Sequence, residues 1–234
     1  MKNLAVITAR SGSKGLHDKN IKLLNGVPLL VYSVKAAQNS ECFQTVFVST
    51  DSSKYAEIAE GYGADASFLR SEKNSSDTAG SWDVVREVVD TFEGQGQYFD
   101  NIMLLQPTSP LRTAEDIKNS FNLMKEKRAS SVIGVTETDH SPLWCNTLPE
   151  SLSMDNFRNE QYCDLPRQKL PKYYRINGAI YLVTREELNV DKLLRKNSFA
   201  YVMPRERSID IDTELDFIIT EHLLNKGGNQ YEHA

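Results

Sequence analysis

Short apolar runs alternate along this chain with longer segments in which apolar residues recur at helical spacing. The runs have the length and composition of buried strands and cover residues 4–7, 45–50, 66–70, 101–106, 130–135 and 177–183. Helices are predicted at about 28–39, 52–62, 82–92 and 114–127, with a last one after residue 213. Strands that alternate with such helices predict an α/β fold with a doubly wound, mostly parallel sheet, whose ligand site lies at the carboxyl ends of the strands.

Two of the predicted helices begin with a capping box. Thr113 pairs with Asp116 at the first of these starts, and Thr213 pairs with Asp216 at the second. The apolar residues of the last helix are expected to face the core: Leu215, Ile218, Ile219 and Leu223.

Length and composition indicate one soluble domain covering 1–234, because 40% of the 234 residues are hydrophobic. The net charge of −5 argues against nucleic acid or a membrane surface as a partner. No apolar run reaches membrane-spanning length, and the first residues are too few for a signal peptide. Cys42, Cys145 and Cys163 are widely spaced and form no disulfide framework, which favours a cytoplasmic location.

A basic, glycine-containing loop follows the first apolar run. Gly12 and Gly15 allow the backbone to turn sharply and its N–H groups to approach an anion. Arg10, Lys14 and Lys19 add positive charge within an acidic protein, which favours one specific anion. A strand that leads into such a loop is typical of a phosphate site, although a solvated basic turn has the same composition. The glycine spacing excludes both a Walker A loop and a dinucleotide-binding fingerprint.

An acidic pair, Asp210 and Asp212, lies in an alternating segment at 208–212. The alternation predicts a half-buried strand with both carboxylates on one face. Two such carboxylates suit Mg²⁺, which prefers hard oxygen ligands and takes several of them from substrate phosphates. Ile209 and Ile211 favour this interpretation because they would bury the opposite face. An exposed acidic strand face would show the same spacing.

The loop at 106–112 contains two prolines directly after a predicted buried strand. A rigid loop at the carboxyl end of a strand can hold Gln106 against a ligand. For Arg112 the sequence leaves two roles open, which are contact with a ligand and support of a neighbouring loop.

Two polar segments, 138–175 and 185–200, interrupt the alternation of strands and helices. A segment as long as the first is uncommon in a compact domain unless it has a role. We expect the two excursions to form an arm that leaves the domain and pairs with another subunit as a homodimer. A long surface loop is the alternative.

Five motifs together resemble the cytidylyltransferases that activate sialic acids and related nonulosonic acids. They are Ala-Arg-x-x-Ser-Lys-Gly from 9, Gln-Pro-Thr-Ser-Pro-Leu-Arg from 106, Pro-Arg-Gln-x-Leu-Pro from 166, Arg-x-Asn-Gly-Ala-Ile-Tyr from 175 and Ser-Ile-Asp-Ile-Asp-Thr from 208. The resemblance implies transfer of CMP from CTP to a sialic acid such as N-acetylneuraminic acid, with release of pyrophosphate. It also implies a doubly wound sheet with a dimerisation arm, a homodimer and a requirement for Mg²⁺.

The resemblance further implies roles for the matching residues. Those of the triphosphate loop are Arg10, Ser13, Lys14 and Lys19. Those around ribose and cytosine are Asn20, Arg70 and Ser81. Those of the sugar-acid site are Gln106, Arg167, Arg175 and Asn177. The implied metal ligands are Asp210 and Asp212, and the implied catalytic residues are Arg10, Lys14, Lys19 and Asp212.

Two departures from the family pattern bear on the substrate. His17 replaces a proline found in many members, and Trp144 replaces a lysine that faces the sugar acid in some. Arg175 is then the main candidate for the substrate carboxylate. Lys14 and Gly15 stand where pseudaminic acid enzymes tend to have Lys-Arg, which disfavours that substrate, whereas legionaminic acid remains open. A non-catalytic nucleotide-binding module is the alternative of another class, and the complete acidic pair argues against it.

Overall fold

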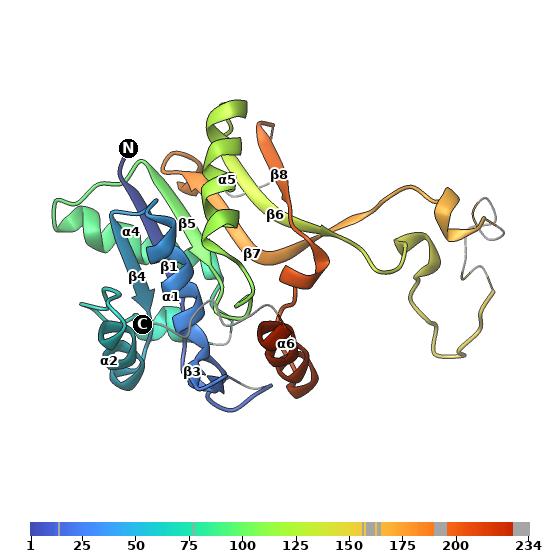
Figure 1. Ribbon diagram of the computed structural model, residues 1–234, viewed down its shortest axis with the longest axis horizontal. Coiled ribbons are helices and arrows are strands. Elements are labelled where there is room, and N and C mark those ends of the chain that lie inside the picture. Colours follow the sequence, from blue (N-terminus) through green and yellow to red (C-terminus); the bar gives the residue numbers. More distant parts are fainter. Residues whose placement is uncertain are drawn as a thin grey trace.

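A six-stranded sheet with the order β4-β1-β5-β7-β6-β8 forms the centre of the computed structural model (Figure 1). The residues described are 1–13, 15–76, 78–155, 157, 162, 165–189 and 196–226. The strands are β1 (Asn3–Thr8), β4 (Thr45–Ser49), β5 (Asn101–Leu105), β6 (Ser131–Glu137), β7 (Tyr174–Thr184) and β8 (Ser198–Val202). Of these six, β7 alone runs against its neighbours. The predicted doubly wound, mostly parallel sheet is therefore confirmed.

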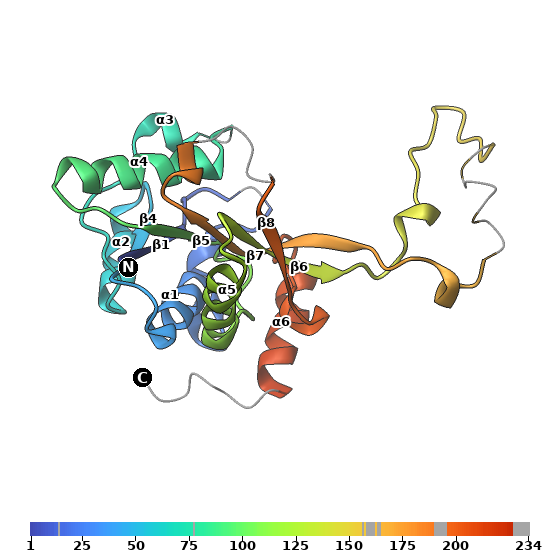
Figure 2. The same ribbon diagram turned by 90° about the horizontal axis from the view of Figure 1, so that it is seen from above.

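Helices cover both faces of the sheet, as Figure 2 shows. They are α1 (Leu29–Ser40), α2 (Ser53–Gly61), α3 (Glu72–Ser75), α4 (Ser81–Gly94), α5 (Ala114–Lys127) and α6 (Glu214–Lys226). Along β1, Ala5 and Ile7 pack on the side of α1, α2 and α5, whereas Leu4 and Val6 pack on the side of α4. This burial of both faces explains why the parallel strands are apolar without a break. None of the described helices is long and apolar enough to cross a membrane.

Three local predictions are wrong. Residues 66–70 form no strand. The apolar residue at their centre, Phe68, instead packs against β4, where its ring stacks on that of Phe47 with the centroids 4.4 Å apart. The segment 208–212 is irregular and follows a 3₁₀ turn, η5 (Arg205–Arg207). The second polar excursion ends in β8, which pairs with β6 at the sheet edge. A short hairpin of β2 (Leu23–Leu24) and β3 (Val27–Pro28) was not predicted.

Helix α6 faces the protein differently from the prediction. Phe217 is buried beside Ile211, whereas Leu215, Ile218 and Ile219 are 65%, 56% and 41% exposed. The predicted capping boxes of α5 and α6 are both present. The capping residues therefore predicted correctly where α6 begins, whereas the spacing of its apolar residues did not predict which side of the helix packs against the core.

The segment between β6 and β7 projects far from the sheet in both views (Figures 1 and 2). It carries two 3₁₀ turns, η2 (Pro142–Trp144) and η3 (Arg167–Lys169). The described part of 185–200 does not join this projection. Leu188, in η4 (Glu187–Asn189), is buried on the side of α4, where its carbonyl accepts a hydrogen bond from Arg86.

A buried carboxylate joins α5 to the chain after β8. Asp116 is 1% exposed and accepts hydrogen bonds from Arg207 at 2.7 and 3.0 Å and from Tyr201 at 3.1 Å. Burial alone would raise its pKa, but the hydrogen bonds from Arg207 and Thr113 outweigh burial and lower it. A lowered pKa stabilises the folded state above the ordinary value of 3.8, and this stability is lost as the pH falls through the folded-state pKa.

Replacing Asp116 with asparagine should lower the free energy of unfolding by about 2 kcal/mol at neutral pH, because charged hydrogen bonds are lost from a buried site. The difference from wild type should shrink as the pH falls below 3.8. Denaturant unfolding at neutral and acid pH measures both effects. The exposed neighbour Glu115 supplies the control, E115Q, which should leave stability nearly unchanged.

Candidate active site

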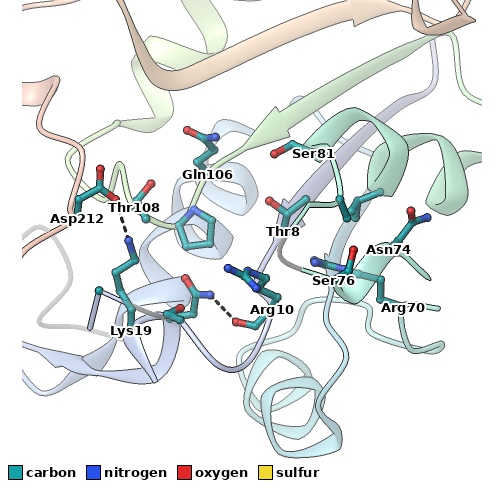
Figure 3. A pocket seen from close by; sticks show the side chains of 16 residues that line it. Thr8, Arg10, Lys19, Arg70, Asn74, Ser76, Ser81, Gln106, Thr108 and Asp212 are labelled. Carbon is teal, nitrogen blue, oxygen red and sulfur yellow. Dashed lines mark hydrogen bonds and ion pairs between the residues drawn. The ribbon is translucent and has the colours of Figure 1, made fainter. Parts of the chain in front are cut away.

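A polar cavity of about 350 Å³ opens at the carboxyl ends of β1 and β5, where a doubly wound sheet is expected to hold its ligand (Figure 3). Most of the residues singled out from the sequence line it: Arg10, Ser13, Lys19, Asn20, Arg70, Ser81, Gln106 and Asp212. Figure 3 shows Lys19, Thr108 and Asp212 at one end, and Arg70, Asn74 and Ser76 at the other, with Arg10 between them. The cavity is therefore elongated, with cations along its length.

The basic loop after β1 is fastened from two sides. Asn20 is buried and donates its side-chain amide to the carbonyl of Arg10 at 2.9 Å. Asp51, after β4, accepts hydrogen bonds from the Ser11 backbone at 2.7 Å and the Ser11 hydroxyl at 2.8 Å. Burial opposes ionisation of Asp51, but these hydrogen bonds prevail and lower its pKa. Asp51 therefore stays ionised at neutral pH and fixes the loop that presents Arg10.

The loop meets the acidic segment before α6 through Lys19. The Lys19 ammonium donates to the carbonyl of Ile211 at 2.6 Å and lies 3.1 Å from a carboxylate oxygen of Asp212. A Cβ atom on Gly15 would lie 2.9 Å from the carbonyl oxygen of Asp212, so only glycine fits this approach. Lys14 lies outside the described residues.

Asp210 and Asp212 do not share a strand face, and they differ in environment. The Asp212 side chain is 75% exposed, whereas one oxygen of Asp210 is buried without a hydrogen-bond partner among the described residues. Burial raises the pKa of Asp210. Both acids line a second cavity of about 700 Å³, together with Arg175 and Arg205. Asp212 belongs to both cavities and marks the border between them.

This pair of acids has the donor chemistry that Mg²⁺ requires. The unpartnered oxygen of Asp210 and the exposed carboxylate of Asp212 are hard ligands on one short segment. Within the described part of the chain, no group of three or more His, Cys, Asp or Glu residues could hold a metal ion. Two carboxylates of this kind fit an ion that takes its remaining ligands from substrate phosphates and water.

Arg70 marks the opposite end of the cavity. It is 9% exposed, and it donates to the carbonyl and the hydroxyl of Ser49 at 2.6 and 3.1 Å. Burial lowers its pKa to about 10, against the opposing influence of Asp51 and Glu87. The guanidinium therefore remains charged at neutral pH and is held in place by the end of β4.

Three residues expected at the sugar-acid site do not line the first cavity. Asn177 is 1% exposed and donates to the Ser208 hydroxyl at 3.0 Å. It therefore supports the segment 208–212 from within the protein. Arg175 lines the second cavity and donates to the Ser208 carbonyl at 3.0 Å. Arg167 lies on the projecting segment and donates to the carbonyl of Asp139 at 2.7 Å. Only Gln106 of this predicted set lies in the first cavity.

Arg112 proves to be a supporting residue. It is 1% exposed and donates to the Ala179 carbonyl at 2.7 Å and the Ser33 hydroxyl at 2.6 Å. These contacts tie the loop after β5 to β7 and to α1. Of the two roles that the sequence left open, support of neighbouring elements is the one observed.

Several residues of the cavity wall were not predicted: Thr8, Asn74, Ser76 and Thr108. Asn74 and Ser76 come from a serine- and asparagine-rich stretch between Arg70 and Ser81. The position of this polar stretch between two predicted site residues could have indicated that it reaches the cavity. No motif, however, identifies which of its residues do so.

Comparison with known proteins agrees with this geometry. The sequence model of a family described as Cytidylyltransferase matches residues 4–225. A relative from Legionella pneumophila, named CMP-N,N'-diacetyllegionaminic acid synthase, is 35% identical over 96% of this chain and 97% of its own length. An N-acylneuraminate cytidylyltransferase from Escherichia coli O18:K1:H7 is 34% identical over 98% of this chain, which spans 54% of that relative.

A solved structure with the same fold is titled as CMP:2-keto-3-deoxy-manno-octonic acid synthetase complexed with CTP. It superposes with a TM-score of 0.73 and covers 97% of this chain and 100% of its own. Its sequence identity is 16%, so the likeness concerns the fold.

Proposed function

This chain belongs to the cytidylyltransferase family, and from that premise we propose that it transfers CMP from CTP to the anomeric hydroxyl of a sialic-acid-type sugar acid. N-acetylneuraminic acid is the first candidate. The observation that carries the proposal is the elongated cavity, with Arg10 between a Lys19–Asp212 end and an Arg70–Ser81 end. A nucleoside triphosphate has the same order of parts, with its base and ribose at one end and its phosphates at the other.

In this proposal the cations hold the triphosphate. Arg10 and Lys19 contact phosphate oxygens, and Lys14 is assigned with them from the family motif alone. Arg70, Ser81 and Asn20 surround the nucleoside, and Ser13 adds a hydroxyl near the phosphates. Preorganised cations of this kind contribute most of the rate in phosphoryl transfer, which requires little covalent chemistry from the protein.

The sugar acid approaches from the second cavity. Arg175 lines that cavity, Asp212 borders both cavities, and Gln106 faces the first, so an acid held between them would reach the α-phosphate. Arg167 and Asn177 act at a distance, one on the arm and one beneath the acidic segment. The anomeric hydroxyl oxygen attacks the α-phosphorus in line and its proton passes to water, while the bond from the α-phosphorus to the bridging oxygen of pyrophosphate breaks.

Asp210 and Asp212 would hold Mg²⁺ on the border between the two cavities. When bound there, the ion would supply positive charge that neutralises the phosphates of CTP. The unpartnered oxygen of Asp210 supports this assignment, because a buried carboxylate oxygen without a partner is costly unless a ligand completes its shell.

Incubation of purified protein with CTP, Mg²⁺ and a panel of sugar acids should release pyrophosphate. The panel comprises N-acetylneuraminic, legionaminic and 3-deoxy-octulosonic acids. Legionaminic acid is the second candidate, because the relative named for it matches this chain over nearly its whole length. Turnover would exclude the alternative of a non-catalytic nucleotide-binding module. Binding of CTP without release of pyrophosphate in the presence of any of these sugar acids would instead favour that module.

We propose further that the protein is a cytoplasmic homodimer whose contacts use the projecting segment between β6 and β7. Exposed apolar side chains on that segment support the proposal, including Leu148, Leu152 and Met154. Light scattering at low micromolar concentration should give twice the chain mass of 26.5 kDa. A fully active monomer would contradict this role of the arm.

A further inference from the structure

We infer that Glu87 is a positioning residue that holds one wall of the nucleotide cavity in its binding conformation. The inference rests on the proposed function, because it concerns CTP binding in the same cavity. The wall is the turn at 71–76, which contributes Asn74 and Ser76 to the cavity lining. Glu87 itself lies behind this wall, on α4, and lines a separate shallow depression together with Ser71 and Asn74.

Three hydrogen bonds from the turn converge on the Glu87 carboxylate. The Ser71 backbone N–H donates to one oxygen at 2.7 Å, and the Ser71 hydroxyl donates to the other at 3.0 Å. The Asn74 side-chain amide also donates to the second oxygen. Hydrogen bonds to an ionised acceptor are the stronger kind, so this carboxylate holds the turn both at its first residue, Ser71, and at Asn74.

The turn requires such a support from outside. Helix α3 covers only Glu72–Ser75, and a helix of one turn is unstable alone because its nucleation is unfavourable. It has no buried residue of its own to anchor it to the core. The contacts within the turn are bonds from Asn74 to Ser71 at 3.4 Å, from Ser75 to Ser71 at 2.7 Å and from Ser76 to Lys73 at 3.1 Å. Besides its bond to Glu87, the Asn74 side chain makes only a long contact of 3.5 Å with the Asp83 carbonyl of α4 among the described residues.

Helix α4 provides a rigid base for this support. Val85, Val88, Val89 and Phe92 are buried with residues of the sheet and fix the helix, while Glu87 lines the depression that Ser71 and Asn74 share. The same carboxylate also acts electrostatically on Arg70, the cation at this end of the cavity. One side chain thus aligns the turn with Arg70, so that CTP meets a wall that is already ordered.

Replacing Glu87 with glutamine keeps its shape but removes its charge and turns an N–H₂ group toward hydrogen-bond donors. CTP should then bind about tenfold more weakly, which corresponds to about 1.4 kcal/mol, because binding must now order the turn. The KM for CTP should rise by the same factor, while kcat and the KM for the sugar acid stay within about twofold. Amide hydrogen exchange should speed up at 71–76 and remain unchanged in α4.

The matched control is D90N, one helical turn further along α4. Asp90 lines the same depression but is exposed, and its carboxylate lies 3.9 Å from Arg185. It accepts none of the three hydrogen bonds that join Glu87 to the turn. D90N should leave CTP affinity and amide exchange at 71–76 unchanged.

A double-mutant cycle tests whether Glu87 and Asn74 act together. If Glu87 acts through Asn74, the effect of N74A should be smaller in the E87Q background than in wild type.

Titration calorimetry with CTP alone separates the possible failures. A wild-type protein that binds no CTP would overturn the proposed function and this role of Glu87 with it. A wild-type protein that binds CTP beside an E87Q variant that binds equally well would overturn the role of Glu87 alone. A melting curve for each variant shows that it is folded, and E87D, which retains the charge, should recover part of the lost affinity.

Discussion

Replacing Asp212 with asparagine should lower turnover about 100- to 1,000-fold while leaving the fold intact. A lost preorganised electrostatic contact costs about 3–4 kcal/mol in the transition state. The neutral amide holds Mg²⁺ poorly and compensates less of the charge that develops on pyrophosphate. Because the Asp212 side chain is 75% exposed, its replacement removes little packing, and the melting temperature should barely change.

Steady-state rates across a magnesium titration, beside a melting curve, measure this effect. CTP should still bind without metal, because Arg10 and Lys19 remain in place. The variant E214Q provides the control, since Glu214 is a neighbouring exposed acid that pairs with Lys22 at 2.5 Å. Wild-type turnover of D212N with an unchanged magnesium dependence would remove Asp212 from the site and weaken the case for Asp210.

Replacing Arg112 with alanine should lower the free energy of unfolding by about 3–5 kcal/mol. The substitution empties the space of a long buried side chain and leaves the Ala179 carbonyl and the Ser33 hydroxyl without their donor. The loop that carries Gln106 loses its shorter tie to β7 in the same step and keeps only the 3.4 Å bond from Ser109 to the Asn177 carbonyl, so activity should fall in the fraction that still folds.

Chemical denaturation of wild type, R112A and R112K distinguishes charge from geometry. Lysine retains the cation but lacks the planar fork that reaches two acceptors, so R112K should recover only a small part of the stability. K125A, which changes an exposed cation on α5, is the control and should be nearly neutral. If R112A were as stable as wild type, Arg112 would have no supporting role.

The elements with strong local signals were predictable. Helix α5 matches its predicted range, because Thr113 and Asp116 form a capping box that leaves little freedom at its start. The irregular segment at 208–212 was not predictable, because Ile211 alternates with acids just as it would in a strand. Ile211 is instead buried beside Phe217, and its N–H donates to the carbonyl of Thr108. An extended segment and a strand share this alternation, and only a partner strand distinguishes them.

The sequence predicted those site residues that the order of strands and loops alone brings to the cavity. It did not predict which way a side chain points within a strand or turn. Arg10 and Gln106 follow the ends of β1 and β5, and Lys19 lies in the loop after β1, so their position in the fold brings them to the cavity. Asn177 belongs to an equally clear motif, but the sheet turns its amide inward to Ser208. Residues such as Asn74 reach the cavity through a turn that tertiary contacts hold in place, and local sequence does not encode those contacts.

The antiparallel strand β7 has a consequence for the order in which the sheet can assemble during synthesis. It occupies the place between β5 and β6, yet it follows β6 in the chain after the whole projecting segment. A growing polypeptide can therefore pair β1 with β4 and β5 early, but β6 has no neighbour in the sheet until β7 leaves the ribosome. Until then one edge of β5 offers unpaired backbone groups, and such an edge promotes aggregation. Slow translation between residues 138 and 174 would lengthen that exposure, whereas a chaperone that covers the β5 edge would shorten it.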